Sequence, residues 1–309
     1  MLTRLVRTSL AIELAAWVGV AAALHAALGI GWFSLAGGIL LAMLGARFAL
    51  VCLTTFLGWL FRSPRAAAHS LGPLGLARLV ASEYRALLVD NFWYLPFDSL
   101  ALRRDPPYES RGPTPVVLVH GYLSNRGYWA PMVRWLEARG VGPIFVPTYR
   151  AIFSSIERGT AELHAEIERI AAGGTPQVVL VCHSMGGLVA RRYLQEHGGG
   201  RVSRLVTIAS PHNGTVLSRM GIGEHARQMR ERSSFLEALS RAEAAGAPTV
   251  PAASIYSVHD NLVAPQETSR LPWARNVALA GVGHVGILSH EPVFALVLEE
   301  LRAAAAARA

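Results

Sequence analysis

The sequence predicts an α/β fold, a doubly wound and mostly parallel sheet, preceded by a hairpin of two transmembrane helices. Three observations support this prediction. Residues 9–61 are almost continuously apolar, short Val- and Leu-rich runs then alternate with segments of helical spacing, and one such run stops at a serine with glycines directly behind it. Because strands that alternate with helices form parallel sheets with right-handed crossovers, the alternation defines the fold class.

The hairpin is the first expected element and occupies residues 1–65 as a membrane anchor. Its two apolar stretches, 9–30 and 32–61, are separated by a short turn. At about 1.5 Å per residue, the first stretch just crosses a hydrocarbon core of about 30 Å, and the second is longer than a crossing needs. Neither stretch has a polar face, which disfavours two buried core helices.

Two alternatives to this hairpin stay open. The first stretch can be interpreted as a signal peptide that starts at Arg4 and Arg7, although no clear Ala-x-Ala cleavage site leads into a polar region. Arg47 interrupts the second stretch, and a turn there would make residues 48–61 a third, short crossing. That segment is short for a span, so two crossings are the preferred interpretation.

The formal net charge is +8, and every basic side chain is an arginine. The arginines lie at the membrane flanks or alternate with glutamates along helices, which disfavours nucleic-acid binding. Arg4 and Arg7 precede the first span, and Arg62 and Arg65 follow the second. The positive-inside rule therefore predicts a multi-pass protein of the bacterial inner membrane with its catalytic part on the cytoplasmic face. A turn at Arg47 would reverse this orientation, and the oligomeric state stays open.

Residues 66–115 are expected to form a linker with an amphipathic helix over 76–91. The Phe92-Trp93-Tyr94 sequence that follows suits either a headgroup-level aromatic belt or packing on the catalytic domain. That domain is expected over 116–309, with a helical cap or lid inserted at 213–247. The expected strands are 116–119, 143–147, 177–182, 202–209, 251–258 and 276–280. The expected helices are 128–139, 156–172, one directly after the serine, and 292–307.

Ser184 occupies the corner between an apolar run and a helix, where a strand-to-helix turn presents a nucleophile. Such a corner is crowded, so small residues are needed two positions before and two positions after the serine. Here these are Cys182 and Gly186, so the Gly-x-Ser-x-Gly motif has one substitution. Cysteine is small enough for the position, and the change removes no functional group.

Asp260 is the candidate acid. A serine alcohol needs a general base, usually an imidazole, and the base needs an orienting carboxylate. At sites of this kind the three residues follow different strands in the order Ser, acid, His. Asp260 comes just after the strand at 251–258 and is the only aspartate beyond Ser184. The alternative role for this side chain is an Asx turn that caps the strand end.

His284 is the candidate base. It follows the strand at 276–280 through Gly281-Val282-Gly283, a loop flexible enough to swing the ring over the serine corner. Its rival, His290, stands where the closing helix is expected to start. His183 and His259 each adjoin a candidate catalytic residue, and because adjacent side chains diverge, we expect both to be structural.

The negative charge of a tetrahedral intermediate needs preorganised backbone N–H groups. One is expected from Met185, directly after the nucleophile. The other is expected from Tyr122, in the loop after the first core strand, where Gly121 lets the backbone turn tightly. His120 is expected to brace this loop rather than to transfer protons. These residues imply no metal and no organic cofactor.

Together these segments resemble the α/β-hydrolase superfamily, and within it bacterial lipases and esterases. The Ser-Pro-His-Asn-Gly-Thr sequence also resembles that of GPI inositol-deacylase-like proteins. The resemblance covers roughly the last two-thirds of the chain. It rests on the segments Val117–Tyr122, Cys182–Gly187 and Thr207–Thr215, and on Asp260 and Gly283-His284.

The sequence thus predicts a membrane-anchored serine hydrolase that cleaves lipid-like or small carboxylic esters and contacts membrane lipids. Acyl transfer to an alcohol and thioester hydrolysis use the same three side chains and stay open as alternatives. A non-catalytic membrane interaction protein of the same fold is a second alternative, for which a broken set of catalytic residues would be expected. A transporter component would need polar residues in more spans than this chain has.

Overall fold

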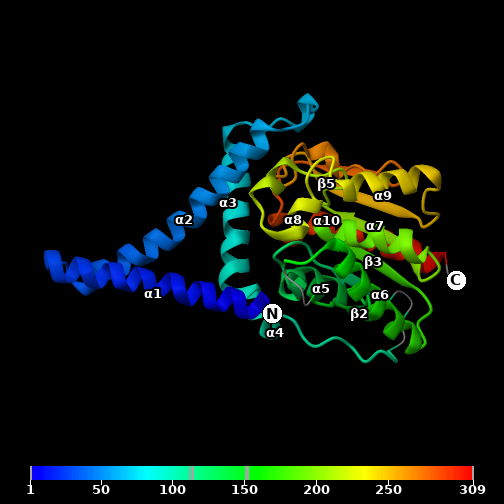
Figure 1. The fold of residues 1–309 in the computed structure, drawn as a ribbon, viewed down its shortest axis with the longest axis horizontal. Coiled ribbons are helices and arrows are strands. Elements are labelled where there is room, and N and C mark those ends of the chain that lie inside the picture. Colours follow the sequence, from blue (N-terminus) through cyan, green and yellow to red (C-terminus); the bar gives the residue numbers. More distant parts are fainter. Residues whose placement is uncertain (1, 111, 113–114, 150–152, 308–309) are drawn as a thin grey trace.

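The computed structural model describes residues 2–110, 112, 115–149 and 153–307, so residues 150–152 and 308–309 of the predicted catalytic domain lie outside the description. Figure 1 shows two parts. The N-terminal helices α1 (Leu2–Leu28) and α2 (Trp32–Leu60) form a long arm, and the rest of the chain packs around a sheet. The tip of the arm points away from this α/β region, while both of its ends return to it.

The sheet contains six strands in the order β2-β1-β3-β4-β5-β6, and all the pairings between them are parallel. The predicted fold class is therefore confirmed. The strands are β1 (Val116–Val119), β2 (Ile144–Phe145), β3 (Val178–His183), β4 (Val202–Ile208), β5 (Ala252–Ser257) and β6 (Arg275–Leu279). The strand order reverses at β1 and β3, and in such sheets the crevice at the carboxyl ends of these strands is where ligands bind.

Helices cover both faces of the sheet, which explains why its central strands are continuous apolar runs rather than alternating ones. On one face, the core around Trp129 and Leu136 includes side chains from α5 and α10. On the other, the core around Ile167 and Tyr193 includes side chains from α6 and α7. These helices are α5 (Ala130–Glu137), α6 (Ile156–Ala172), α7 (Met185–His197) and α10 (Glu291–Ala306).

The segment between β4 and β5, in which the sequence predicted a cap, has two parts. Its first part contains η4 (Val216–Met220) and α8 (Gly223–Gln228). Its second part is α9 (Ser234–Ala245), which packs on α7 and contributes Phe235, Leu236 and Leu239 to the core there. Only the first part lies at the pocket described below.

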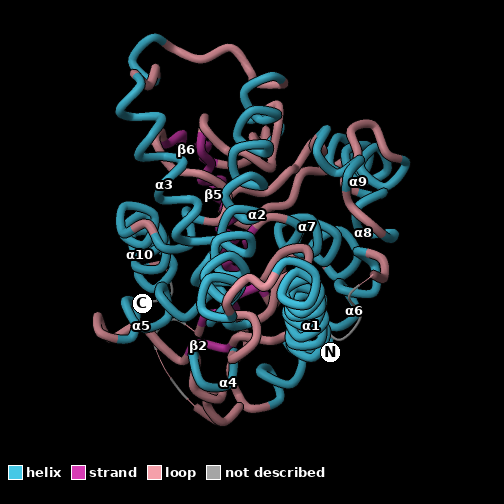
Figure 2. The backbone as a smooth tube through the Cα atoms, turned by 90° about the vertical axis from the view of Figure 1, so that its left-hand side faces the viewer, coloured by secondary structure: helices cyan, strands magenta, loops and turns pink. Residues whose placement is uncertain are grey.

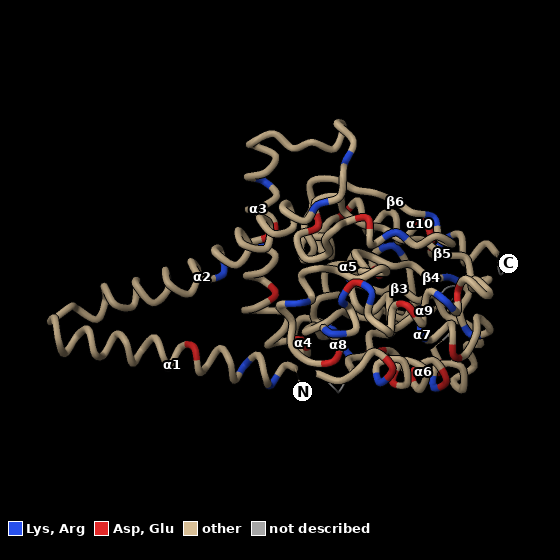
Figure 3. Tube along the Cα trace, turned by 45° about the horizontal axis from the view of Figure 1, so that its top comes forward, with Lys and Arg blue, Asp and Glu red and all other residues tan. Residues whose placement is uncertain are grey.

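The arm is a hairpin, and each of its helices is long and apolar enough to cross a membrane by length and composition. Figure 3 shows that the outer part of the arm is almost free of charged residues. Helix α2 continues through Arg47, whose guanidinium forms a two-pronged ion pair with Glu13 of α1. The alternative of a turn at Arg47, with a third crossing after it, is therefore wrong, because the helix is continuous there. The ion pair within the hairpin accounts for this arginine.

Helix α3 (Pro73–Val89), in the predicted linker, packs beside α2 and against the short helix η6 (Gly286–Ser289) of the α/β region. Figure 2 views the arm nearly end-on and shows α3 next to α2. A π-helical turn, η2 (Asp90–Tyr94), and the short helix α4 (Asp98–Ala101) follow. In the aromatic run, Tyr94 accepts a hydrogen bond from Arg134 and so packs on the α/β region. Trp93 is 47% exposed, and its part in an aromatic belt stays a prediction.

Candidate active site

Ser184 lies at the corner between β3 and α7, with φ 54° and ψ −126°. Residues other than glycine rarely adopt such a conformation, and strain of this kind clusters at functional positions. The neighbouring glycines make room for the corner. A Cβ atom at Gly186 would lie 2.5 Å from the carbonyl oxygen of Val119, and one at Gly121 would lie 2.8 Å from Cβ of Ser184. Cys182 is fully buried in β3, as the substituted motif requires.

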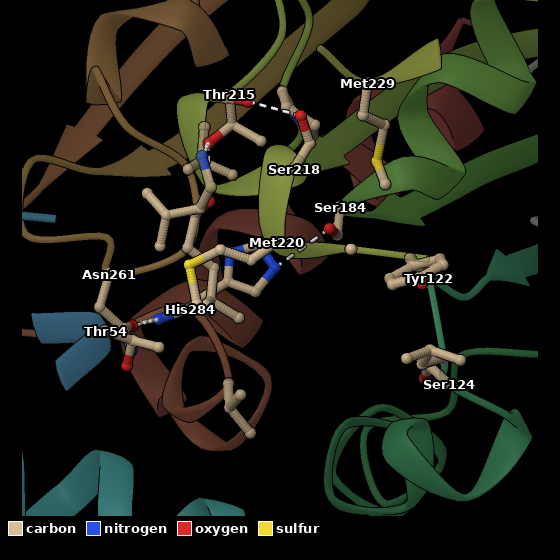
Figure 4. Close-up of a pocket in the computed structure, with 18 of the residues that line it drawn as sticks. Thr54, Tyr122, Ser124, Ser184, Thr215, Ser218, Met220, Met229, Asn261 and His284 are labelled. Carbon is tan, nitrogen blue, oxygen red and sulfur yellow. Dashed lines mark hydrogen bonds between the residues drawn. The ribbon is translucent and has the colours of Figure 1, made fainter. Parts of the chain in front are cut away.

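The imidazole of His284 lies between Ser184 and Asp260. Its Nε2 atom is 3.0 Å from Oγ of Ser184, as Figure 4 shows, and its Nδ1 atom is 2.8 Å from Oδ2 of Asp260. The structure therefore brings together the three side chains that the sequence singled out. His290 instead stands directly before α10, where the start of that helix was expected.

The carboxylate of Asp260 uses each of its oxygens differently. Oδ1 accepts hydrogen bonds from the backbone N–H groups of Leu262 at 2.8 Å and Val263 at 2.7 Å, while Oδ2 faces His284. Asp260 therefore has both of the roles considered from the sequence: Oδ1 caps the turn, and Oδ2 orients His284. Held at two backbone points, the carboxylate fixes the direction in which the imidazole points.

The electrostatic surroundings favour a basic His284. Burial opposes protonation of the ring, but the charge and hydrogen bond of Asp260, together with the charge of Glu83, outweigh burial and raise the pKa of His284. A histidine with a raised pKa is a stronger proton acceptor, which suits a group that must take the proton of an alcohol.

The two predicted oxyanion donors belong to segments next to Ser184. Met185 is the first residue of α7, where backbone N–H groups and the helix dipole favour negative charge. Tyr122 follows Gly121 at the carboxyl end of β1, which lies beside β3 with Val119 opposite Cys182. The side chain of Tyr122 has another role: its Oη donates to the carbonyl oxygen of Ile222 at 2.7 Å and accepts from the N–H of Ile222 at 2.9 Å.

The other histidines of this region are structural in their contacts. Nδ1 of His120 is 2.9 Å from the carbonyl oxygen of Gly121, and its Nε2 accepts from the N–H of Tyr149, so the ring braces the loop after β1. Burial lowers the pKa of His120 to about 4. His183 contacts the carbonyl oxygen of His284, and His259 accepts from the N–H of Gly281. None of these rings is hydrogen-bonded to Ser184.

Three further residues touch this site and were not singled out from the sequence. Asn261 accepts a hydrogen bond from the N–H of His284 through Oδ1 and donates to Thr54 of α2 through Nδ2, both at 2.9 Å. Glu83 of α3 accepts hydrogen bonds from two N–H groups of the loop after His284. The one available signal in the sequence was Glu83 itself, the single acidic residue within α3, with Asp90 directly after the helix.

A cavity of about 470 Å³ opens next to Ser184 and His284. Its size is within the usual range for small-molecule sites. Met220 and Met229 extend toward it in Figure 4. Most of its lining is apolar. The loops of the α/β region contribute Leu123 and Val263 among others, and the rest includes Leu50 and Val51 of α2, Leu87 of α3, and Leu217, Met220 and Ile222 of the segment around η4.

This sheet order, with a serine corner after β3 and a histidine loop after β6, defines the α/β-hydrolase fold, which confirms the resemblance noted from the sequence. The model of the PGAP1-like alpha/beta domain family matches residues 161–260, a span that includes Ser184 and Asp260 but ends before His284.

Two solved structures show the same fold. Aspergillus fumigatus lipase B is 20% identical, with a TM-score of 0.56, over 63% of this chain and 54% of that one, so the match spans about half of the fungal lipase. The mature form of Bacillus licheniformis lipase BlEst2 is 19% identical, with a TM-score of 0.54, over 64% of this chain and 96% of that one. The fold of this chain is thus the fold of these two lipases.

Proposed function

We propose that this protein is a membrane-anchored serine hydrolase that cleaves carboxylic esters of lipid-like molecules through an acyl-enzyme. The observation on which the proposal rests is the position of His284, hydrogen-bonded to Ser184 on one side and to Asp260 on the other. This geometry lies beside an apolar cavity on a fold that supports ester hydrolysis.

In the first half of the reaction, Oγ of Ser184 attacks the acyl carbonyl while His284 accepts its proton through Nε2. Asp260 stabilises the imidazolium that forms and holds the ring in place. The N–H groups of Tyr122 and Met185 stabilise the negative oxygen of the tetrahedral intermediate. His284 then returns the proton to the alcohol that leaves, and the acyl group remains on Ser184.

In the second half, water takes the place of the alcohol. His284 removes a proton from the water, the hydroxide attacks the acyl carbon, and the same two N–H groups stabilise the second intermediate. Collapse of this intermediate releases a carboxylic acid and restores the Ser184 hydroxyl. The reaction needs no redox partner, because only protons and the acyl group move.

The lipid-like nature of the substrate is supported by the composition of the cavity wall. Leu50 and Val51 belong to α2, one of the two helices long and apolar enough to span a membrane. At about 1.5 Å per residue, α2 is about 43 Å long, which exceeds a hydrocarbon core of about 30 Å. This length supports a site at the membrane surface, because the inner end of α2 can line the cavity while its outer part crosses the bilayer.

The cytoplasmic face of the bacterial inner membrane is the proposed location of the α/β region. Both ends of the hairpin lie at this region, so they share one side of the membrane (Figure 1). Arg4, Arg7 and Arg62 stand at these ends, and the positive-inside rule assigns such ends to the cytoplasm. Protease treatment of intact spheroplasts should leave the α/β region uncut; cleavage there would reverse the assignment.

The catalytic assignment is tested by covalent labelling. A fluorophosphonate probe should label the full-length protein in detergent micelles, and Ser184→Ala should abolish both labelling and ester hydrolysis. Ser203→Ala is a matched control, because that serine lies on β4 with its hydroxyl bonded to the carbonyl oxygen of Val178. Persistent labelling of the Ser184→Ala protein would rule out the proposal.

The substrate class is tested with a series of p-nitrophenyl esters of increasing acyl length. The purified protein should prefer long acyl chains, and the preference should be strongest for esters presented in mixed micelles. A preference for the shortest soluble esters under both conditions would exclude lipid-like substrates and leave a small-ester hydrolase.

A further inference from the structure

Three consecutive backbone N–H groups in the loop that holds His284 donate hydrogen bonds to side chains rather than to other backbone groups. The N–H of His284 donates to Oδ1 of Asn261 at 2.9 Å. The N–H groups of Val285 and Gly286 donate to Oε1 and Oε2 of Glu83, each at 2.8 Å. The position of the candidate base therefore depends on two acceptor side chains, one of which comes from outside the α/β region.

Glu83 is an unusual choice for a structural contact. The side chain is on α3 and is only 2% exposed. Both of its carboxylate oxygens accept from the loop, and no arginine in the described part of the chain is hydrogen-bonded to it. A carboxylate is costly to bury, and two charge-assisted hydrogen bonds to backbone N–H groups compensate part of that cost. A leucine would leave both loop N–H groups without an acceptor, and a glutamine amide accepts through only one of its two ends, so a carboxylate is the side chain that holds both groups.

The loop is shaped to receive this carboxylate. A Cβ atom at Gly283 would overlap Oε2 of Glu83, and one at Gly286 would lie 3.0 Å from the same oxygen. The two glycines flank His284 and Val285, and Gly283 in particular leaves the space that the carboxylate occupies. From the sequence, Gly283 is interpreted as a source of flexibility. In the structure this glycine instead provides space between Glu83 and Asn261.

The second acceptor is itself held by the hairpin. Nδ2 of Asn261 donates to Oγ1 of Thr54 at 2.9 Å, a contact that Figure 4 shows at the edge of the cavity. Thr54 is 6% exposed and lies on the inner part of α2. The bond directs Oδ1 of Asn261 toward the N–H of His284, because the two ends of an amide group point in opposite directions.

We propose that Glu83 and Thr54 are positioning residues for the reaction, which hold the His284 loop so that Nε2 stays within reach of Ser184. The proposal rests on the proposed function of Ser184 and His284. We call Glu83, Asn261 and Thr54, together with their hydrogen bonds, the clamp. The proposal makes α2 and α3 part of the catalytic apparatus, because disturbing the clamp leaves the substrate cavity in place but misaligns His284. A misplacement of about 1 Å can lower a rate by about a hundredfold.

The test uses the full-length protein in detergent micelles and a short, soluble p-nitrophenyl ester. Glu83→Gln keeps the volume but sets an amide N–H₂ against one of the two loop N–H groups, and kcat should fall by about tenfold to a hundredfold. Thr54→Val removes the acceptor of Asn261 and should lower kcat by about tenfold. Both side chains line the cavity, but each substitution nearly preserves the shape of the side chain, so KM should stay within about twofold of the wild type.

Neighbouring residues give matched controls. Ser82→Ala removes a hydroxyl that bonds only within α3, and Thr55→Val repeats the hairpin substitution one position further along α2. Both should retain wild-type kcat within about twofold. Thermal unfolding measured on the same samples separates loss of alignment from loss of folded protein.

The outcomes distinguish this inference from the proposed function. A kcat loss in Glu83→Gln or Thr54→Val with an unchanged KM and a folded protein supports the clamp. Wild-type kcat in both variants overturns it, while an inactive Ser184→Ala protein leaves the proposed function intact. Turnover by Ser184→Ala would instead overturn the proposed function. If Glu83→Gln does not fold, Thr54→Val decides, since loss of kcat supports the clamp and unchanged kcat contradicts it.

Discussion

The two ends of helix α2 differ in what surrounds their glycines. In the outer arm, a Cβ atom added at Gly37, Gly38 or Gly45 would have no other part of the described chain within 4 Å. At the inner end, a Cβ atom at Gly58 would lie 2.9 Å from Cα of Asn261 and 3.0 Å from the carbonyl oxygen of Asp260. The glycines of the outer arm thus face open space, whereas Gly58 is pressed against the loop that contains Asp260 and Asn261.

This difference shows that the hairpin is more than a tether. The inner segment of α2 is defined as residues 50–60. It lines the cavity through Leu50 and Val51, and through Thr54 and Gly58 it contacts the loop that contains Asp260 and Asn261. The outer arm, residues 14–46, exposes apolar side chains such as Leu24, Phe33 and Leu41. We therefore expect substitutions in the inner segment to change catalysis and the same substitutions in the outer arm to be tolerated.

The largest effect is expected at the acid that the inner segment touches. Asp260→Asn should lower the plateau of kcat/KM by about a thousandfold to ten-thousandfold, because the amide cannot stabilise the imidazolium or hold the same tautomer. Only neutral His284 accepts the serine proton, so kcat/KM of the wild type should fall as the pH drops through the raised pKa of this ring. Without the charge of Asp260, burial is the larger influence on the pKa of His284 and lowers it. The acidic limb of the pH profile of kcat/KM, where the rate falls with falling pH, should therefore move to lower pH. A limb that stays in place in Asp260→Asn would contradict this assignment.

The next largest effect tests the contact at Gly58. Gly58→Leu should push α2 away from the backbone of Asp260 and Asn261 and lower kcat by about a hundredfold, since overpacking displaces neighbouring backbone. Gly38→Leu places the same side chain in the outer arm and should leave kcat within about twofold of the wild type. Initial rates with a short soluble ester measure both. Equal losses in the two variants would mean that the hairpin acts as a single unit.

A smaller and more selective effect is expected at the cavity wall. Leu50→Trp adds bulk to the cavity and should lower the rate with the longest acyl chains by about tenfold, while the shortest ester is unaffected. Leu41→Trp makes the same change on the outer arm and should keep the wild-type acyl-length profile. The p-nitrophenyl ester series measures the ratio of the rate with the longest acyl chain to the rate with the shortest. If this ratio is unchanged in Leu50→Trp, the acyl chain lies elsewhere.

The smallest effect is expected at the boundary between the two parts of the hairpin. Glu13→Gln breaks the ion pair with Arg47, which joins α1 to α2 outside the inner segment. The hairpin should lose thermal stability, while kcat with a soluble ester stays within about twofold of the wild type. A large fall in kcat would extend the catalytic part of the hairpin outward beyond Leu50.

The serine corner and the strands were predictable because they depend on local patterns. An apolar run, small residues at positions 182 and 186, and chain order lead to Ser184, Asp260 and His284 without knowledge of the tertiary fold. Helix α6 has the predicted bounds, because Ser155 caps it and its apolar residues recur at helical spacing. Each of these features is encoded within a short stretch of sequence.

The clamp on the histidine loop could not be predicted in this way. Glu83 and Thr54 lie about 200 positions from the residues that they hold, 202 in the case of Glu83 and Val285 and 207 in the case of Thr54 and Asn261. Their role exists only once α2 and α3 dock on the α/β region. The sequence likewise placed Gly283 in a flexible loop, because nothing local shows that a distant carboxylate fills the space beside it.

The contact between Thr54 and Asn261 also bears on how this enzyme is prepared. Removing the hairpin to obtain a more soluble protein would take away the acceptor of Asn261 and part of the cavity wall together. The shortened chain would keep Ser184, Asp260 and His284 in its sequence, yet its rates would describe a differently shaped enzyme. Inhibitor screens and kinetic comparisons should therefore use the intact chain, since the hairpin supplies part of the surface that a ligand meets.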